Sequence, residues 1–222
     1  MARAGSDRGE VVLRQRLDPD RPESPSVLEL RVSGVFVMDT FETRTEVALA
    51  RAALEEVEQP RRVLVGGLGL GFTAHEVLAD SRVEQVVVAE IEDALVGWFR
   101  DGTVPHGPGY LADERLRITV ADVRLVVQEA GEAAYDLVLL DVDNGPEFLV
   151  HAENAELYEA GFLQAAQRAL SPGGRLVVWS STRSAELEAE MSRAFGSCRV
   201  TGLPVELQGR EEEYWLFSAA AG

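Results

Sequence analysis

Hydrophobic and polar residues alternate through the first 40 residues in a pattern that predicts short strands. The alternation runs over Glu10–Leu17 and again over Val27–Val32, with a proline-rich interruption between them, and the short apolar run Val35–Met38 follows. Alternation with a period of two is typical of antiparallel strands that bury one face. Residues 1–41 therefore predict a small N-terminal β region.

The rest of the chain, residues 42–222, alternates apolar strands with amphipathic helices. A first helix ends at Pro60, and Asp101–Tyr110 indicates a loop. Apolar runs of strand length recur at Val63–Val65, Gln85–Ala89, Leu116–Val120, Tyr135–Leu140, Arg175–Trp179 and Glu212–Phe217. The helices between them are expected at about 71–80, 92–100, 122–130, 155–170 and 184–195. Apolar strands joined by helical crossovers predict an α/β fold with a mostly parallel sheet flanked by helices.

Composition and charge limit the kinds of molecule that the protein is expected to bind. The 222 residues are 46% hydrophobic and carry 38 acidic and 21 basic side chains, a net charge of −17. This charge argues against nucleic acid and anionic membrane surfaces, and it favours cationic or neutral small molecules. Every basic residue is arginine, which excludes lysine-dependent chemistry. One cysteine and no zinc-spaced cluster predict no metal site. With no apolar leader, the default expectation is the cytoplasm.

A glycine-rich turn follows the first strand of the predicted parallel sheet. Gly67, Gly69 and Gly71 come directly after Val63–Val65 and begin a helix. Glycine allows a tight turn and a close approach of backbone to ligand, and a helix N-terminus offers free N–H groups. The pattern predicts a nucleotide or nucleoside site, with a tightly packed strand–helix turn as the structural alternative.

Acidic residues end the next strands at the same edge of the sheet. Glu90 lies 19 residues after Gly71, where an acid can accept the hydroxyls of a ribose, and an exposed strand end is the alternative. Asp122 precedes a helix, so it could cap that helix, accept the exocyclic amine of adenine, or do both. Asp141 ends the fourth strand, where a carboxylate can bind a cation or take a proton from an amine.

The segments that carry these residues resemble the spermidine synthases, which are aminopropyltransferases on the class I S-adenosylmethionine-dependent methyltransferase fold. The resemblance covers about residues 60–182 and rests on RRVLVGGLGLGFTAHEVL, VEQVVVAEIEDALV, ITVADVR, YDLVLLDVDNGP and NAELYEAGFLQAAQRALSPGGRLVVWS. It implies a Rossmann-like sheet of seven strands and a homodimer.

The resemblance also implies roles for individual residues. An S-adenosylmethionine or decarboxylated S-adenosylmethionine donor would be bound by Gly67, Gly69, Leu70, Gly71, Glu90, Ile91, Asp122 and Val123. Asp141 would be the catalytic aspartate that positions and deprotonates the attacking amine, and the acceptor would also be bound by Glu46, Asp143 and Asn144.

At two positions the sequence differs from the family, so the type of reaction is not decided by the resemblance. The family has an aspartate at the position of Leu70, where it reads the terminal amine of the decarboxylated donor, so Leu70 is expected to set donor choice. The second aspartate of the family's catalytic loop falls on Asn144. The leading expectation is metal-free alkylation of a small-molecule amine. The alternatives are a small-molecule methyltransferase, a non-catalytic nucleoside-binding protein and an NAD-dependent dehydrogenase, which would lack an obvious hydride-site pair.

Overall fold

A four-stranded antiparallel sheet forms the N-terminal part of the protein. The computed structural model describes residues 2–17, 26–142, 145–149, 151–207 and 210–222. The strands follow one another in the sheet as β1 (Ala2–Ser6), β2 (Gly9–Arg16), β3 (Val27–Val32) and β4 (Val35–Asp39). Alternate residues of β2 and β3 are buried, among them Val11, Leu13 and Leu30. β1 was not expected, because its residues include no large apolar side chain.

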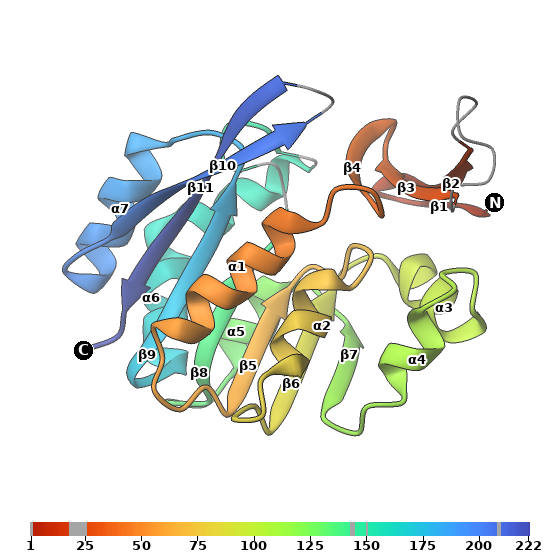
Figure 1. Cartoon of the computed structure of the whole chain (residues 1–222). Coiled ribbons are helices and arrows are strands. Elements are labelled where there is room, and N and C mark those ends of the chain that lie inside the picture. Colours follow the sequence, from red (N-terminus) through yellow and green to blue (C-terminus); the bar gives the residue numbers. More distant parts are fainter. Residues whose placement is uncertain (1, 18–25, 143–144, 150, 208–209) are drawn as a thin grey trace.

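The second sheet has seven strands in the order β10–β11–β9–β8–β5–β6–β7 (Figure 1). Its strands are β5 (Arg62–Gly66), β6 (Gln85–Glu90), β7 (Leu116–Val120), β8 (Tyr135–Leu140), β9 (Leu170–Ser180), β10 (Arg199–Leu207) and β11 (Arg210–Ala220). β11 runs antiparallel to both of its neighbours, and the pairs from β9 to β7 are parallel. The expected α/β class with a mostly parallel sheet is confirmed, although β10 was not predicted.

Helices cover both faces of this sheet. One layer contains α1 (Arg44–Glu55), α2 (Phe72–Ala79), α3 (Asp93–Asp101) and α4 (Gly107–Leu111). The other contains α5 (Val123–Glu129), the 3₁₀ segment η1 (Ala152–Tyr158), α6 (Ala160–Ala169) and α7 (Ala185–Phe195). Within β5, Val63 and Val65 pack toward the first layer and Leu64 toward the second. Burial on both faces explains why this strand is continuously apolar.

Two helix predictions were wrong in detail. The expected loop Asp101–Tyr110 contains the start of α4, where Pro108 lies in the first helical turn and its missing N–H is not needed. The single helix expected over 155–170 is divided at Glu159, whose backbone is extended, into η1 and α6.

The strand order places a natural ligand site at one edge of the main sheet. The chain proceeds from β5 outward to β7 and then returns to the other side of β5 as β8. The connections that follow β5 and β8 lead to helices on opposite faces of the sheet, and α/β sheets bind ligands at such a point. The N-terminal sheet, drawn apart from the helical layers above α3 in Figure 1, contacts the loops after β5 and β6. No helix in the described part of the chain is long and apolar enough to cross a membrane.

Candidate active site

A cavity lies at this edge, between the main sheet and the N-terminal sheet. The residues predicted from the sequence that line it are Gly67, Gly69, Glu90, Ile91, Asp122, Val123, Asp141 and Glu46. The N-terminal sheet supplies an apolar wall that includes Val11, Leu30, Val32 and Met38. The structure thus brings together residues from six different elements. Asp143 and Asn144 lie outside the described residues.

Gly67 allows the loops after β5 and β8 to meet. Its φ of +92° is in the left-handed region, and a Cβ at this position would lie 2.1 Å from the carbonyl oxygen of Asp141. The Gly67 N–H donates to the carbonyl of Ala89, and the Asp141 N–H donates to the carbonyl of Gly66, each at 2.9 Å. A side chain at position 67 would push the Asp141 backbone out of place.

Leu70 does not line the cavity, contrary to the role expected for it. Its side chain is fully buried in the core on the α1–α4 side of the sheet. Its N–H donates to Met38 Sδ at 3.1 Å, and its carbonyl accepts from His106 Nε2 at 2.7 Å. The backbone of the glycine turn is therefore held from both sides. Gly71, with φ +86°, packs on Phe99 and is also absent from the lining.

Glu90 is held in place by backbone donors. Its Oε2 accepts the N–H of Leu68 at 2.9 Å and its Oε1 accepts the N–H of Glu92 at 2.7 Å. Only 6% of the residue is exposed, so the exposed strand end considered above is wrong. Burial raises the pKa of the Glu90 carboxyl, although the two backbone donors oppose this shift. The carboxylate is fixed in one orientation and lines the cavity.

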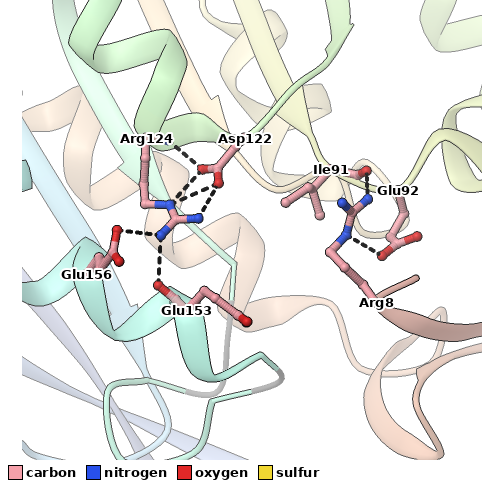
Figure 2. A network of polar contacts seen from close by, with 7 residues as sticks. All are labelled: Arg8, Ile91, Glu92, Asp122, Arg124, Glu153 and Glu156. Carbon is pink, nitrogen blue, oxygen red and sulfur yellow. Dashed lines mark hydrogen bonds and ion pairs between the residues drawn. The ribbon is translucent and has the colours of Figure 1, made fainter. Parts of the chain in front are cut away.

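Asp122 caps α5, which is one of the roles considered for it in the sequence, and its side of the loop lines the cavity. Its carboxylate accepts the N–H of Arg124 at 2.8 Å and is held by the Arg124 guanidinium in a fork (Figure 2). The same guanidinium donates to the carbonyl of Glu153 and to the carboxylate of Glu156 in η1. Burial alone would raise the pKa of Asp122, but Arg124 lowers it below its ordinary value.

Glu46 and Asp141 form a pair of carboxyl groups with no cation beside them among the described residues. Burial and the nearby Asp141 charge raise the pKa of Glu46 to about 7. Burial also raises the pKa of Asp141, whose Oδ2 accepts a hydrogen bond from Thr73 Oγ1 at 2.8 Å. Thr45 Oγ1 donates to Glu46 Oε2 at 2.7 Å. Two partly exposed acids that resist simultaneous ionisation form a site for a proton or a cationic group.

An aromatic pair lies next to these acids. Trp179, near the end of β9, lines the cavity. Its ring meets Tyr214 of β11 edge to face, with centroids 5.1 Å apart. Burial raises the pKa of Tyr214, and the charges of Glu212, Glu46 and Glu42 add to that shift. The end of the cavity near Glu46 and Asp141 thus joins aromatic surface to negative charge, a combination that suits organic cations.

Several contributing residues were missed from the sequence. Thr73 could have been found, because a threonine in the first turn after the glycine motif faces the end of the neighbouring strand. Arg124 also carries a local signal, since it lies two residues after a capping aspartate. Met38 and Arg8 carry none, because their partners are far away in the chain.

Comparison with known proteins gives the family of the chain. Residues 42–197 match the family model of the spermine/spermidine synthase domain, which is most of the chain. The chain belongs to the spermine/spermidine synthase family. The match covers the main sheet through α7 and leaves out β1–β4, β10 and β11.

Relatives within this family include two transferases of different kinds. Over 123 residues the chain is 30% identical to putrescine N-methyltransferase 3 of Nicotiana tabacum, an alignment that covers 54% of this chain and 30% of the relative. Over 139 residues it is 31% identical to polyamine aminopropyltransferase 2 of Hyperthermus butylicus, covering 61% and 43%. The chain therefore spans less than half the length of these curated relatives.

A solved structure supports the fold across the whole chain. The crystal structure of a spermidine synthase in complex with the transition-state analogue AdoDATO superposes with a TM-score of 0.81. It shares 18% sequence identity and covers 100% of this chain and 73% of the other. The N-terminal sheet, β10 and β11 thus belong to the same overall fold, although the family model does not include them.

Proposed function

We propose that the protein transfers an aminopropyl group from decarboxylated S-adenosylmethionine to a small amine. The observation that carries this proposal is the charge of the cavity. Its described lining contains five carboxylates, Glu46, Glu90, Glu92, Asp122 and Asp141, and no arginine. A donor with a sulfonium and a terminal ammonium suits such a lining. The carboxylate of S-adenosylmethionine would find no counter-charge there.

The nucleoside part of the donor is assigned to the loops after β5, β6 and β7. Glu90 has an orientation that lets its carboxylate accept ribose hydroxyls, with Ile91 beside it. Asp122 and Val123 border the position for adenine. Because Arg124 already forks Asp122, the exocyclic amine would be the further donor to a carboxylate that is already oriented. Gly67 and Gly69 leave room for the sulfonium end.

Asp141 and Glu46 would act on the acceptor amine. An ammonium has no lone pair, so the nitrogen must be neutral to attack the carbon next to sulfur. As the N–C bond forms, the C–S bond breaks and its electron pair passes to sulfur, which leaves as a neutral thioether. The positive charge moves to nitrogen, where Asp141 stabilises it and takes the proton. Glu46 shares the negative charge, and Thr73 fixes the Asp141 side chain.

Product analysis tests this function. Wild-type protein is incubated with decarboxylated S-adenosylmethionine or with S-adenosylmethionine, each with a panel of small amines that includes putrescine, and products are identified by mass spectrometry. Aminopropylated amine formed with the decarboxylated donor supports the proposal. Amine-independent decay of the donor, or no reaction with either donor, contradicts it.

Methyl transfer from S-adenosylmethionine is the second candidate. The alignment with relatives named putrescine N-methyltransferases favours it. Asp141 would act on the amine in the same way, and the amine would attack the methyl carbon of S-adenosylmethionine. Methylated amine in the same assay would select this reaction.

We further propose that the enzyme is a homodimer that works in the cytoplasm. Val35 and Phe36 on the edge strand β4 and Phe41 just after it are exposed, and an open strand edge with apolar residues favours pairing. The cytoplasmic location rests on the sequence alone. Light scattering on the purified protein tests the dimer, and a monomer at micromolar concentration would contradict it.

A further inference from the structure

The N-terminal sheet contacts the donor loops at two separate places. At one, Met38 Sδ accepts the N–H of Leu70 in the glycine turn. At the other, the turn between β1 and β2 contacts the loop after β6. There Arg8 donates through Nη2 to the carbonyl of Ile91 and through Nε to Glu92 Oε1 at 3.3 Å (Figure 2). The apolar wall of the cavity lies between these contacts.

The second contact differs from a surface ion pair because its acid, Glu92, is buried. Only 6% of the residue is exposed, and a buried carboxylate needs hydrogen bonds or a cation. Among the described residues, its side-chain partners are Ser6 Oγ at 3.4 Å and Arg8, both from the N-terminal hairpin. The backbone N–H of the same residue donates to Glu90 Oε1. Arg8 is therefore linked through one residue to the carboxylate assigned to the ribose.

Arg124 and Arg8 differ in which parts of the fold they join. In Figure 2 the two arginines hold acids of neighbouring loops. Arg124 joins Asp122 to η1, so both of its partners belong to the main α/β fold. Arg8 joins two sheets across 84 residues of sequence, and 40% of its side chain is exposed. An exposed ion pair opens more readily than a buried one, whereas the carboxylate beneath it stays buried.

We propose that Arg8 is a positioning residue that latches the N-terminal sheet over the donor cavity. Opening of the Arg8 contacts with Ile91 and Glu92 lets the hairpin move away and lets the donor exchange. Closing them orders the loop that carries Glu90 around the bound nucleoside. This inference rests on the proposed function, because it takes the cavity as the donor site.

The experiment measures exchange of a nucleoside ligand in Arg8→Met, which keeps the length of the side chain and removes its charge and donors. The probe is 5′-methylthioadenosine, followed by stopped-flow tryptophan fluorescence, to which Trp179 at the cavity wall contributes. The latch predicts a dissociation rate raised about tenfold, with an association rate that is unchanged or faster. Arg8→Lys, which keeps the charge, should lie between. The matched control is Arg3→Met in the same hairpin, whose partner is the exposed Glu10, and it should behave as wild type.

The outcomes separate the latch from a structural role and from the proposed function. A dissociation rate within twofold of wild type in Arg8→Met overturns the latch, and so does an equal change in Arg3→Met. If wild-type protein does not bind the probe, the proposed donor site fails. The latch is then decided by amide exchange without ligand. It predicts faster exchange at Leu68 and Glu92 in Arg8→Met with the melting temperature unchanged, and unchanged exchange overturns it.

Discussion

The two ends of the cavity satisfy their carboxylates in opposite ways. At the donor end, Glu90 is bound by backbone N–H groups and Asp122 by an arginine fork, so both side chains have fixed orientations before any ligand binds. At the acceptor end, Glu46 and Asp141 have hydroxyl donors and each other's charge. The donor end therefore presents carboxylates of fixed orientation, whereas the acceptor end holds negative charge that a cationic amine would neutralise.

The contrast suggests how such an enzyme can keep its donor while changing its acceptor. Carboxylates that are oriented by backbone depend on the fold, and the fold is common to the family. A carboxyl pair whose charge is balanced only by the substrate depends on a few side chains, which can change without loss of the fold.

The largest effect is expected at the acceptor end, from Asp141→Asn. This change keeps size and removes charge and basicity, so turnover should fall by about 10²–10⁴-fold. Affinity for 5′-methylthioadenosine, which lacks the charged tail of the donor, should change little, because Glu90 and Asp122 are the residues proposed to bind the nucleoside. Steady-state kinetics and calorimetry measure the two effects. Asp101→Asn, at an exposed position at the end of α3, is the control. Unchanged turnover in folded Asp141→Asn would remove the catalytic role.

Glu90→Gln tests the donor end. Loss of a charge-assisted hydrogen bond should weaken binding of methylthioadenosine by roughly 1–3 kcal/mol. Because Glu90 is buried and accepts two backbone N–H groups, the melting temperature should fall as well. The control is Glu84→Gln just before the same strand, where the side chain is exposed. Full affinity in folded Glu90→Gln would place the ribose elsewhere.

Glu46→Gln should move the pH dependence of catalysis. Burial and the charge of Asp141 raise the pKa of Glu46 to about 7, so kcat/KM should rise as Glu46 loses its proton through about 7. In Glu46→Gln the group that titrates there is gone, and the acidic limb should move to lower pH. Glu55→Gln, on an exposed position of the same helix, should leave the profile in place. If the acidic limb stays at the same pH in Glu46→Gln, ionisation of Glu46 does not affect catalysis through Asp141.

The smallest effect is expected on the stability of the protein without ligand, and the two ends should respond to opposite pH changes. Because the pKa of Glu46 is higher in the folded protein than in the unfolded chain, Glu46 stabilises the fold most at pH values below its unfolded pKa. This contribution is lost as pH rises through about 7. The lowered pKa of Asp122 favours folding at neutral pH, and this contribution is lost in acid. Glu46→Gln should therefore melt roughly 3 °C above wild type at pH 8.5 and equally near pH 4, below the unfolded pKa of 4.5.

Asp122→Asn should differ from wild type in the opposite direction, with a lower melting temperature at pH 7 and a difference that shrinks as the pH falls below the ordinary aspartate value. Scanning calorimetry across pH checks both variants. If Glu46→Gln is no more stable than wild type at alkaline pH, the carboxyl pair is not strained.

Much of the main sheet could be predicted from its sequence, because β5, β6, β8 and β9 are buried on both faces and are continuously apolar. β1 and β10 could not, since β1 is short and polar and β10 mixes Gly202 and Pro204 into its length. The cavity lining was largely predicted, because Glu90, Asp122 and Asp141 end successive strands. Leu70 was misplaced because the direction of its side chain depends on Met38 and His106, which contact the turn from elsewhere in the chain.

Calorimetric binding of the two donors tests the central claim most directly, namely that unbalanced negative charge beside the donor's tail sets the chemistry. Wild-type protein is titrated at pH 8, where Glu46 and Asp141 carry the most charge, with decarboxylated S-adenosylmethionine and with S-adenosylmethionine. The account predicts at least tenfold tighter binding of the decarboxylated donor, about 1.4 kcal/mol, and a smaller preference in Glu46→Gln. Equal affinity for both donors, or tighter binding of S-adenosylmethionine, would contradict it.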